Sequence, residues 1–258
     1  LVRVLDDDVL EQFTFIFMEY VGEMSLESQL STLGQLPASR IARIGLAVAD
    51  ALAAATHEGF LHRDVKPANI LERRDGHVKL ADFGIATYRS AKGQLADESA
   101  AHGLIMGTPS YISPEQVMQP DAIDFRSDMY SQGATLYHAA TDRPPLDRAT
   151  EDATLMAHVN EEPPAIQQLV PGFDPQLGQV IHRMLRKRPA ERYPSWDALR
   201  TELRRIVDDD SILEISLVEP GRPAVADPSR TLDLPVLPPV SAASMPLLEQ
   251  QVMAPPVA

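Results

Sequence analysis

The stretch that decides how this 258-residue chain folds is residues 62–69, which read His62-Arg63-Asp64-Val65-Lys66-Pro67-Ala68-Asn69. It brings a carboxylate, an ammonium group and a carboxamide into one short segment. Three more motifs follow in order: Asp82-Phe83-Gly84, Gly107-Thr108-Pro109-Ser110-Tyr111 and Ser113-Pro114-Glu115. Any one tripeptide would be a weak signal, but the eight-residue stretch followed by the others at suitable spacing is a strong one.

The segments around these motifs have a mixed strand and helix pattern. Residues 1–5 and 13–18 read as strands, and the acidic run at 6–8 reads as a turn between them. A helical pattern begins at Ser25, and one long amphipathic helix is expected from Pro37 to near Gly59, because apolar residues recur there at i+3 and i+4 spacing. The ranges that remain are predicted as a hairpin at 70–80, a long loop at 82–115, and helices near 126–140, 150–160, 175–187 and 195–208.

Taken together, the motifs resemble the serine/threonine protein kinase family, and most of all its bacterial, eukaryotic-like branch. The resemblance covers roughly residues 1–207. It implies an α+β, protein-kinase-like fold, in which residues 1–21 are a remnant of the small-lobe β-sheet with its hinge and residues 22–207 are a mostly helical large lobe. It also implies ATP and Mg²⁺ as cofactors and serine or threonine hydroxyls of proteins as acceptors.

The resemblance assigns the phosphoryl-transfer chemistry to a few residues. Phosphoryl transfer needs an aligned hydroxyl and neutralised phosphate charge, and little covalent help. Asp64 would accept the proton of the substrate hydroxyl, and Lys66 would place a cation beside the transferring group. Asn69 and Asp82 would supply the oxygen ligands that Mg²⁺ prefers. Thr108 is expected near Asp64 and Lys66, and a lysine at position 66 favours serine/threonine over tyrosine substrates.

A second set of residues is implied to bind adenine. Met18-Glu19-Tyr20-Val21 resembles the hinge segment of the family, with Met18 as gatekeeper. The backbone of Glu19 and Val21 would supply hydrogen bonds, and Leu71 would form the floor of the adenine pocket. These residues are also what the core of a strand and a hairpin would contain, and both interpretations can hold together.

Other residues are implied to hold the site in shape. His62 would pack below Phe83 of the Asp82-Phe83-Gly84 motif and be structural rather than a general base. Glu115 and Arg192 would form a buried ion pair. Asp128 would hydrogen-bond to the backbone of the catalytic loop.

The resemblance also implies regulation by phosphorylation. Arg63 precedes Asp64 directly, and kinases with this arginine are often switched on by a phosphate on the following loop. Ser99 is the preferred acceptor by its distance from Thr108, and Thr87 and Ser90 are the other candidates.

Two parts that the family needs are missing from the printed residues. These parts are a glycine-rich loop over the phosphates and a lysine on the third strand. The first glycine of the chain is Gly22 and its first lysine is Lys66. Because the chain also begins with Leu1, we expect an N-terminally truncated kinase that is inactive as printed.

Two alternative functions stay open. The first is a non-catalytic, pseudokinase-like binding module, although Asp64, Asn69 and Asp82 are all present. The second is a small-molecule phosphotransferase of related fold. Lys66-Pro67 and the segment 107–115 argue against that second function, because the segment shapes a groove for peptides.

The composition of the chain argues against several other classes of function. A net charge of −14 argues against binding nucleic acid through a basic surface, and the absence of cysteine excludes a disulfide scaffold, a thiol nucleophile and a cysteine-zinc site. No apolar run approaches the length of a membrane-spanning helix, so a cytoplasmic location is expected. Nine of the 22 prolines lie between Pro220 and Pro256, and we expect 208–258 to be an acidic tail without a fixed fold that can dock an unknown partner.

Overall fold

The computed structural model describes residues 1–10, 13–22, 24–73, 75–82, 87–88 and 107–209. They belong to one compact unit that runs from Leu1 to Val218. The predicted tail lies outside the described residues from position 210 onward, and Asp208 is the last residue of the final helix rather than the first of the tail. Among the described residues, no helix is both long and apolar enough to cross a lipid bilayer.

The chain begins with an antiparallel hairpin of β1 (Val4–Leu10) and β2 (Phe13–Met18). Asp6, Asp7 and Asp8 pair with Phe17, Ile16 and Phe15 in its register. The prediction of a turn at these three aspartates was therefore wrong. Backbone pairing with β2 does not depend on side-chain type, so an acidic run can continue a strand whose partner is already in place.

A second, three-stranded sheet lies beside the stretch that decides the fold. It contains β3 (Met24–Ser25), β5 (Ile70–Glu72) and β6 (Val78–Leu80), in the order β3-β5-β6. The hairpin predicted at residues 70–80 is confirmed, and Gly76 has the positive φ of 82° that its tight turn requires. Two short strands, β4 (Phe60–Leu61) and β7 (Thr87–Tyr88), pair with each other, so the predicted loop at 82–115 contains a strand.

Helices make up most of the rest, and they agree with the predicted ranges to within a few residues. The short helices α3 and α6 were not predicted. The α-helices are α1 (Leu26–Leu33), α2 (Ala38–His57), α3 (Pro114–Met118), α4 (Phe125–Thr141), α5 (Glu151–Asn160), α6 (Ile166–Leu169), α7 (Pro175–Met184) and α8 (Trp196–Asp208). Single 3₁₀ turns lie at η1 (Pro67–Asn69), η3 (Pro109–Tyr111), η4 (Pro120–Ala122) and η5 (Pro189–Glu191).

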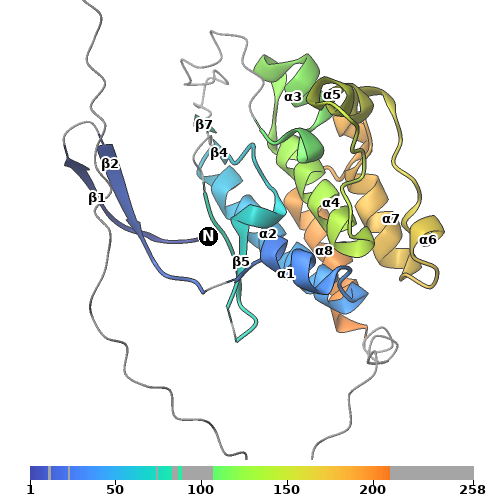
Figure 1. Cartoon of the computed structure of the whole chain (residues 1–258), viewed down its shortest axis with the longest axis horizontal. Coiled ribbons are helices and arrows are strands. Elements are labelled where there is room, and N and C mark those ends of the chain that lie inside the picture. The colour runs from blue at the N-terminus through green and yellow to red at the C-terminus, as the bar shows by residue number, and fades with distance from the viewer. Residues whose placement is uncertain (11–12, 23, 74, 83–86, 89–106, 210–258) are drawn as a thin grey trace, which may run out of the picture. The chain divides into compact units, whose positions relative to one another are not determined.

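The core is built around α2 and α4. Helix α2 packs against α8 and α4, and α4 packs in turn against α7 (Figure 1). The apolar face predicted for α2 is buried, with Ile41, Ile44, Val48 and Leu52 almost fully covered. A β-carbon at Gly133 of α4 would lie 2.8 Å from the β-carbon of Met184, so glycine lets α4 and α7 approach closely.

Candidate active site

The segment 62–69 lies between β4 and β5 and ends in η1, and α4 fixes its backbone. Asp128 of α4 is buried, and its two carboxylate oxygens accept hydrogen bonds from the backbone N–H groups of His62 (2.8 Å) and Arg63 (2.7 Å). Burial raises the pKa of the Asp128 carboxyl, while these two donors stabilise its ionised form. Further along, Thr135 of α4 donates to the carbonyl of Val65 at 3.3 Å. The loop is thus held against a rigid helix.

His62 is fully buried, and both of its ring nitrogens contact backbone groups. Its Nε2 lies 3.0 Å from the carbonyl oxygen of Ala81, and its Nδ1 accepts from the N–H of Asp64 at 3.3 Å. In this arrangement Nδ1 is the acceptor and Nε2 faces an acceptor. Because both ring nitrogens face backbone groups, the geometry supports a structural role for this histidine and not a general-base role.

Asp64, Lys66 and Thr108 form a closed polar triangle. Asp64 Oδ1 accepts hydrogen bonds from the N–H (3.0 Å) and the hydroxyl (2.7 Å) of Thr108. Lys66 Nζ lies 2.6 Å from Asp64 Oδ2 and donates to the Thr108 hydroxyl at 2.9 Å. Thr108 is 44 residues away from Asp64 in sequence, so this triangle joins two segments that only the fold brings together. It orients a carboxylate and a cation toward one point.

Asn69 and Asp82 lie close to this triangle through backbone contacts. Asn69 donates from Nδ2 to the carbonyl of Asp64 at 2.8 Å, which leaves its amide oxygen as the group able to ligate a cation. The N–H of Ala81 donates to the carbonyl of Asn69 at 2.8 Å, so the next residue, Asp82, is held near Asn69. Asp82 has a φ of 63°, a left-handed conformation that is uncommon for a residue with a side chain.

This donor set fits Mg²⁺. An amide oxygen and a carboxylate are hard oxygen ligands, and Mg²⁺ binds through one or two carboxylates while keeping waters and substrate phosphates. Among the described residues, no cluster of three or more His, Cys, Asp or Glu side chains could hold a metal by itself. A metal at Asn69 and Asp82 would therefore need further ligands from water and from a phosphate.

The segment 107–116 packs directly on the segment 62–69. Gln116 Nε2 donates to the carbonyl of Arg63 at 3.0 Å, and Arg63 itself is buried with a φ of 66°. A β-carbon at Gly107 would lie 3.2 Å from the same carbonyl, and the φ of Gly107 is 126°. Glycine at this position lets the segment approach closely enough for Thr108 to reach Asp64.

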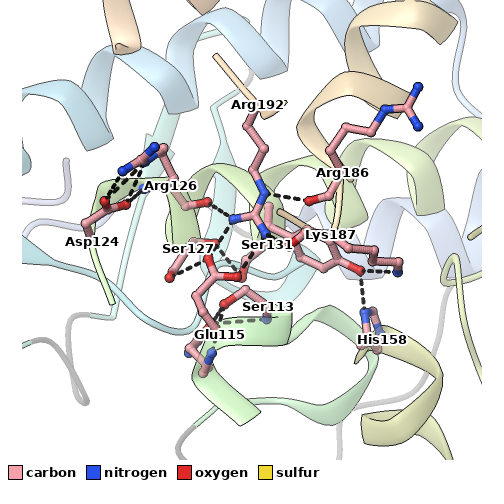
Figure 2. Close-up of polar contacts among 12 residues, drawn as sticks. Ser113, Glu115, Asp124, Arg126, Ser127, Ser131, His158, Arg186, Lys187 and Arg192 are labelled. Atoms are coloured by element: carbon pink, nitrogen blue, oxygen red, sulfur yellow. Dashed lines mark hydrogen bonds and ion pairs between the residues drawn. The ribbon is translucent and has the colours of Figure 1, made fainter. Parts of the chain in front are cut away.

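Behind this segment lies a buried ion pair (Figure 2). Arg192 follows η5 and donates to both carboxylate oxygens of Glu115 on α3, from Nη1 at 2.6 Å and from Nη2 at 2.8 Å. Its remaining N–H groups donate to the carbonyls of Arg126, Arg186 and Lys187. Ser127 donates to Glu115 at 2.8 Å. The guanidinium thus has an acceptor for each of its five donors, which is how a buried charge is tolerated.

The predicted adenine-binding residues are less enclosed. Met18 ends β2 and is about half exposed, while Val21 is buried. Glu19 donates its N–H to the carbonyl of Arg3 at 2.9 Å, so only its carbonyl could bind a base. Its carboxylate pairs with Lys79, which lowers the pKa of Glu19.

Leu71 lies in β5, opposite Ser25 and Lys79 in the sheet, and its side chain is partly buried. A cavity of about 940 Å³ lies beyond this segment, between Val21, the start of α2 at Arg40, and the β5–β6 turn. It does not include Asp64, Asn69 or Asp82.

Several predicted residues cannot be placed. Phe83, Gly84, Ser90 and Ser99 lie outside the described residues, and of Thr87 only its place in β7 is described. The packing of His62 below Phe83 and the choice of phosphorylated residue therefore stay predictions.

Some residues that build the site were missed from the sequence. Gln116 has a detectable signal, because Ser113 and Gln116 form a capping box of the S-x-x-Q type at the start of α3. Tyr130, His158 and Lys187, which form a polar network next to Arg192, carry no local signal, since they come from three separate segments.

Comparison with known proteins gives the family. The protein kinase domain family matches residues 1–203. The chain is 35% identical over 198 residues to a probable serine/threonine-protein kinase, SCO3848, of Streptomyces coelicolor, covering 77% of this chain and 29% of the relative. It is 35% identical over 192 residues to serine/threonine-protein kinase PknB of Mycolicibacterium smegmatis, covering 74% and 30%.

A third relative, serine/threonine-protein kinase PknL of Mycobacterium tuberculosis, is 32% identical over 224 residues, covering 87% of this chain and 55% of the relative. In all three comparisons the matched region is less than two thirds of the relative's own length.

Proposed function

This chain belongs to the serine/threonine protein kinase family, and on that premise we propose that its segments 62–82 and 107–115 transfer the γ-phosphate of ATP to serine and threonine hydroxyls of proteins. The observation that carries the proposal is the triangle of Asp64, Lys66 and Thr108. It places a general base, Asp64, beside a cation, Lys66, and Thr108 from a separate segment contacts both of them.

Each residue of the triangle has a distinct task. Asp64 accepts the proton of the attacking hydroxyl, and its backbone is fixed by Asn69 and by the contact of its N–H with His62. Lys66 lies 2.6 Å from that carboxylate, so it places a cation beside the group that receives the proton. Thr108 holds both groups in one orientation, so little rearrangement is required when a hydroxyl arrives.

Other residues of the chain would hold the cofactors. When bound, ATP supplies the phosphoryl group, and Mg²⁺ neutralises part of the negative charge of the phosphates. Asn69 and Asp82 would hold the metal ion, and the backbone around Glu19 and Val21 would hold the base. The oxygen donors of Asn69 and Asp82 support this placement of the metal ion.

We also propose that residues 1–258 alone do not transfer phosphate. In the printed residues the first lysine is Lys66 and the first glycine is Gly22, so none of the printed residues before Gly22 can act as the glycine loop or the strand lysine of the family. Positioning of the phosphates supplies most of the catalysis in this reaction class. The same observation favours a second function for the isolated chain, that of a non-catalytic binding module.

A chimera separates these functions. In it, the residues of the M. smegmatis PknB relative that precede its match to this chain are joined ahead of Leu1. Transfer from γ-labelled ATP to a mixture of serine-, threonine- and tyrosine-containing peptides is then measured for the chimera and for residues 1–258. We expect the chimera to label serine and threonine peptides and residues 1–258 to give background only. A folded chimera without transfer would leave the binding module as the function, and turnover by residues 1–258 equal to that of the chimera would refute the proposed inactivity.

A further inference from the structure

Lysine is scarce in this chain, and one of its lysines has unusual surroundings. The four lysines are Lys66, Lys79, Lys92 and Lys187. Lys66 pairs with Asp64 at 2.6 Å and Lys79 pairs with Glu19 at 2.5 Å. Lys92 lies outside the described residues. In the part of the chain that the structure describes, Lys187 makes no ion pair with a carboxylate.

The ammonium of Lys187 lies instead against a phenol ring. Its Nζ donates to the hydroxyl of Tyr130 at 3.2 Å and lies 5.6 Å from the centre of that ring. The guanidinium of Arg192 lies 4.9 Å from the same ring centre. The Tyr130 hydroxyl is also 2.9 Å from His158 Nδ1. The ammonium of Lys187 and the guanidinium of Arg192 therefore both contact the ring of Tyr130.

No nearby charge compensates Lys187 fully. Glu161 and Glu162, which follow α5, attract the ammonium at longer range, but Glu161 is itself paired with Arg148. Glu115 is the carboxylate on α3, and both of its oxygens are bound to Arg192.

The protonation of Lys187 follows from these surroundings. Burial, followed by repulsion from Arg192, lowers its pKa to about 8, against the attraction of Glu162 and Glu161. At pH 7.5 about one amine in four is then neutral, compared with about one in a thousand for an ordinary lysine. A neutral amine next to another cation is the usual form of a nucleophilic lysine.

The side chain is also within reach of solvent. Lys187 is partly exposed, and it is flanked in sequence by the exposed Arg186 and Arg188. Together they form a run of three basic residues in a chain of net charge −14, with Arg188 4.0 Å from Glu191, and cationic side chains attract small anions. Acyl phosphates combine an anionic phosphate with an activated carbonyl, so they match both the flanking charge and the nucleophile.

We propose that Lys187 is a site of covalent acylation by small acyl phosphates. The lone pair of Nζ attacks the acyl carbon, a C–N bond forms, and the C–O bond to the phosphate breaks. Inorganic phosphate leaves with the electron pair, and the amine loses one proton to solvent. The product is a neutral amide whose remaining N–H can still donate to the Tyr130 oxygen, while the second cation next to Arg192 is gone.

The test uses acetyl phosphate as the probe and residues 1–258 as the protein. Acetylation of each lysine is followed by mass spectrometry of proteolytic peptides from pH 6.5 to 9.5, and circular dichroism checks that the protein stays folded. Lys79 is the reference inside the same molecule, because its ammonium is ion-paired. At pH 7.5 we expect Lys187 to react at least about tenfold faster than Lys79, with a rate that levels off near pH 8.

Three controls complete the test. Lys187→Arg keeps the charge and must remove the fast site. Tyr130→Phe keeps the ring but removes the oxygen that stabilises the ammonium, so the rate should level off at a lower pH. In 8 M urea, about the strongest unfolding condition in common use, the rates at Lys187 and Lys79 should become equal. A folded protein in which Lys187 reacts no faster than Lys79, or in which its rate rises without levelling up to pH 9.5, overturns the proposal.

Discussion

Arg192 and Glu115 are 77 residues apart in sequence, yet they form a bidentate ion pair in which the guanidinium is fully buried. Glu115 lies in the first turn of the short helix α3, which follows the segment that holds Thr108. Arg192 comes from the turn between α7 and α8. The pair therefore fixes the end of the segment 107–115 to the helical core, which helps to hold Thr108 against Asp64.

Removing the charge of Glu115 should destabilise the protein strongly. Glu115→Gln leaves Arg192 charged and buried, and breaking one partner of such a pair costs about 3–5 kcal/mol. Urea unfolding can be followed through the fluorescence of Trp196, the single tryptophan of the chain, which is buried. The matched control is Glu191→Gln, because Glu191 is exposed and lies 4.0 Å from Arg188. We expect that variant to lose less than about 1 kcal/mol, and equal losses in both variants would contradict the assignment.

Asp128→Ala should loosen the catalytic loop. The change leaves the buried N–H groups of His62 and Arg63 without their acceptors, at a cost of about 1–3 kcal/mol each. Amide hydrogen exchange measures the protection of these N–H groups, and those of residues 62 and 63 should exchange faster in the variant. Asp121→Ala, at an exposed site in η4, is the control. Unchanged protection at residues 62 and 63 would show that α4 does not hold the loop.

His158 should make the protein less stable in mild acid. Burial lowers its pKa to about 4, below the ordinary 6.5, so the unfolded state binds the proton more tightly than the folded state. Stability is then complete above about pH 7 and falls as the pH drops from about 6.5 toward 4, by about 3 kcal/mol from this residue. Burial lowers the pKa values of His138 and His182 as well.

Urea midpoints at pH 7.5, 6.0 and 5.0 test this dependence. The His158→Gln variant should show a flatter fall with pH than the parent. A parent protein with the same stability at pH 7.5 and pH 5.0 would rule out the effect.

Thr108→Val should slow transfer without unfolding the protein. Valine keeps the shape but removes the hydroxyl that bridges Asp64 and Lys66, so both groups lose orientation. In the chimera we expect kcat to fall about tenfold or more, with the KM for ATP nearly unchanged. Thr108→Ser should restore most of the rate. If serine and valine behave alike, the hydroxyl has no part in the reaction.

Much of the helical part could be predicted from the sequence. The buried face of α2 follows from apolar spacing, and the hairpin at 70–80 follows from Asp75-Gly76. The proximity of Thr108 to Asp64 could not come from spacing alone, and only the resemblance supplied it. Local rules failed where the partner strand decides the structure, as at Asp6–Asp8 in β1.

The polar network next to Arg192 shows the other limit of sequence reasoning. Tyr130, His158 and Lys187 come from α4, α5 and the segment after α7, and each is ordinary in its own stretch of sequence. The unusual protonation of Lys187 arises from burial and from Arg192, and both are properties of the assembled fold. Such a site becomes visible only once the helices are packed together.

Asp64 is proposed as the base of a phosphoryl transfer, and one measurement tests this role most directly. Transfer of γ-labelled phosphate to a threonine peptide is measured for the chimera and for its Asp64→Asn variant, with Asp121→Asn as the control. We expect Asp64→Asn to lower kcat about 10²–10⁴-fold while the unfolding midpoint stays close to that of the parent, and Asp121→Asn to keep full activity. Undiminished transfer by a folded Asp64→Asn chimera would contradict the assignment.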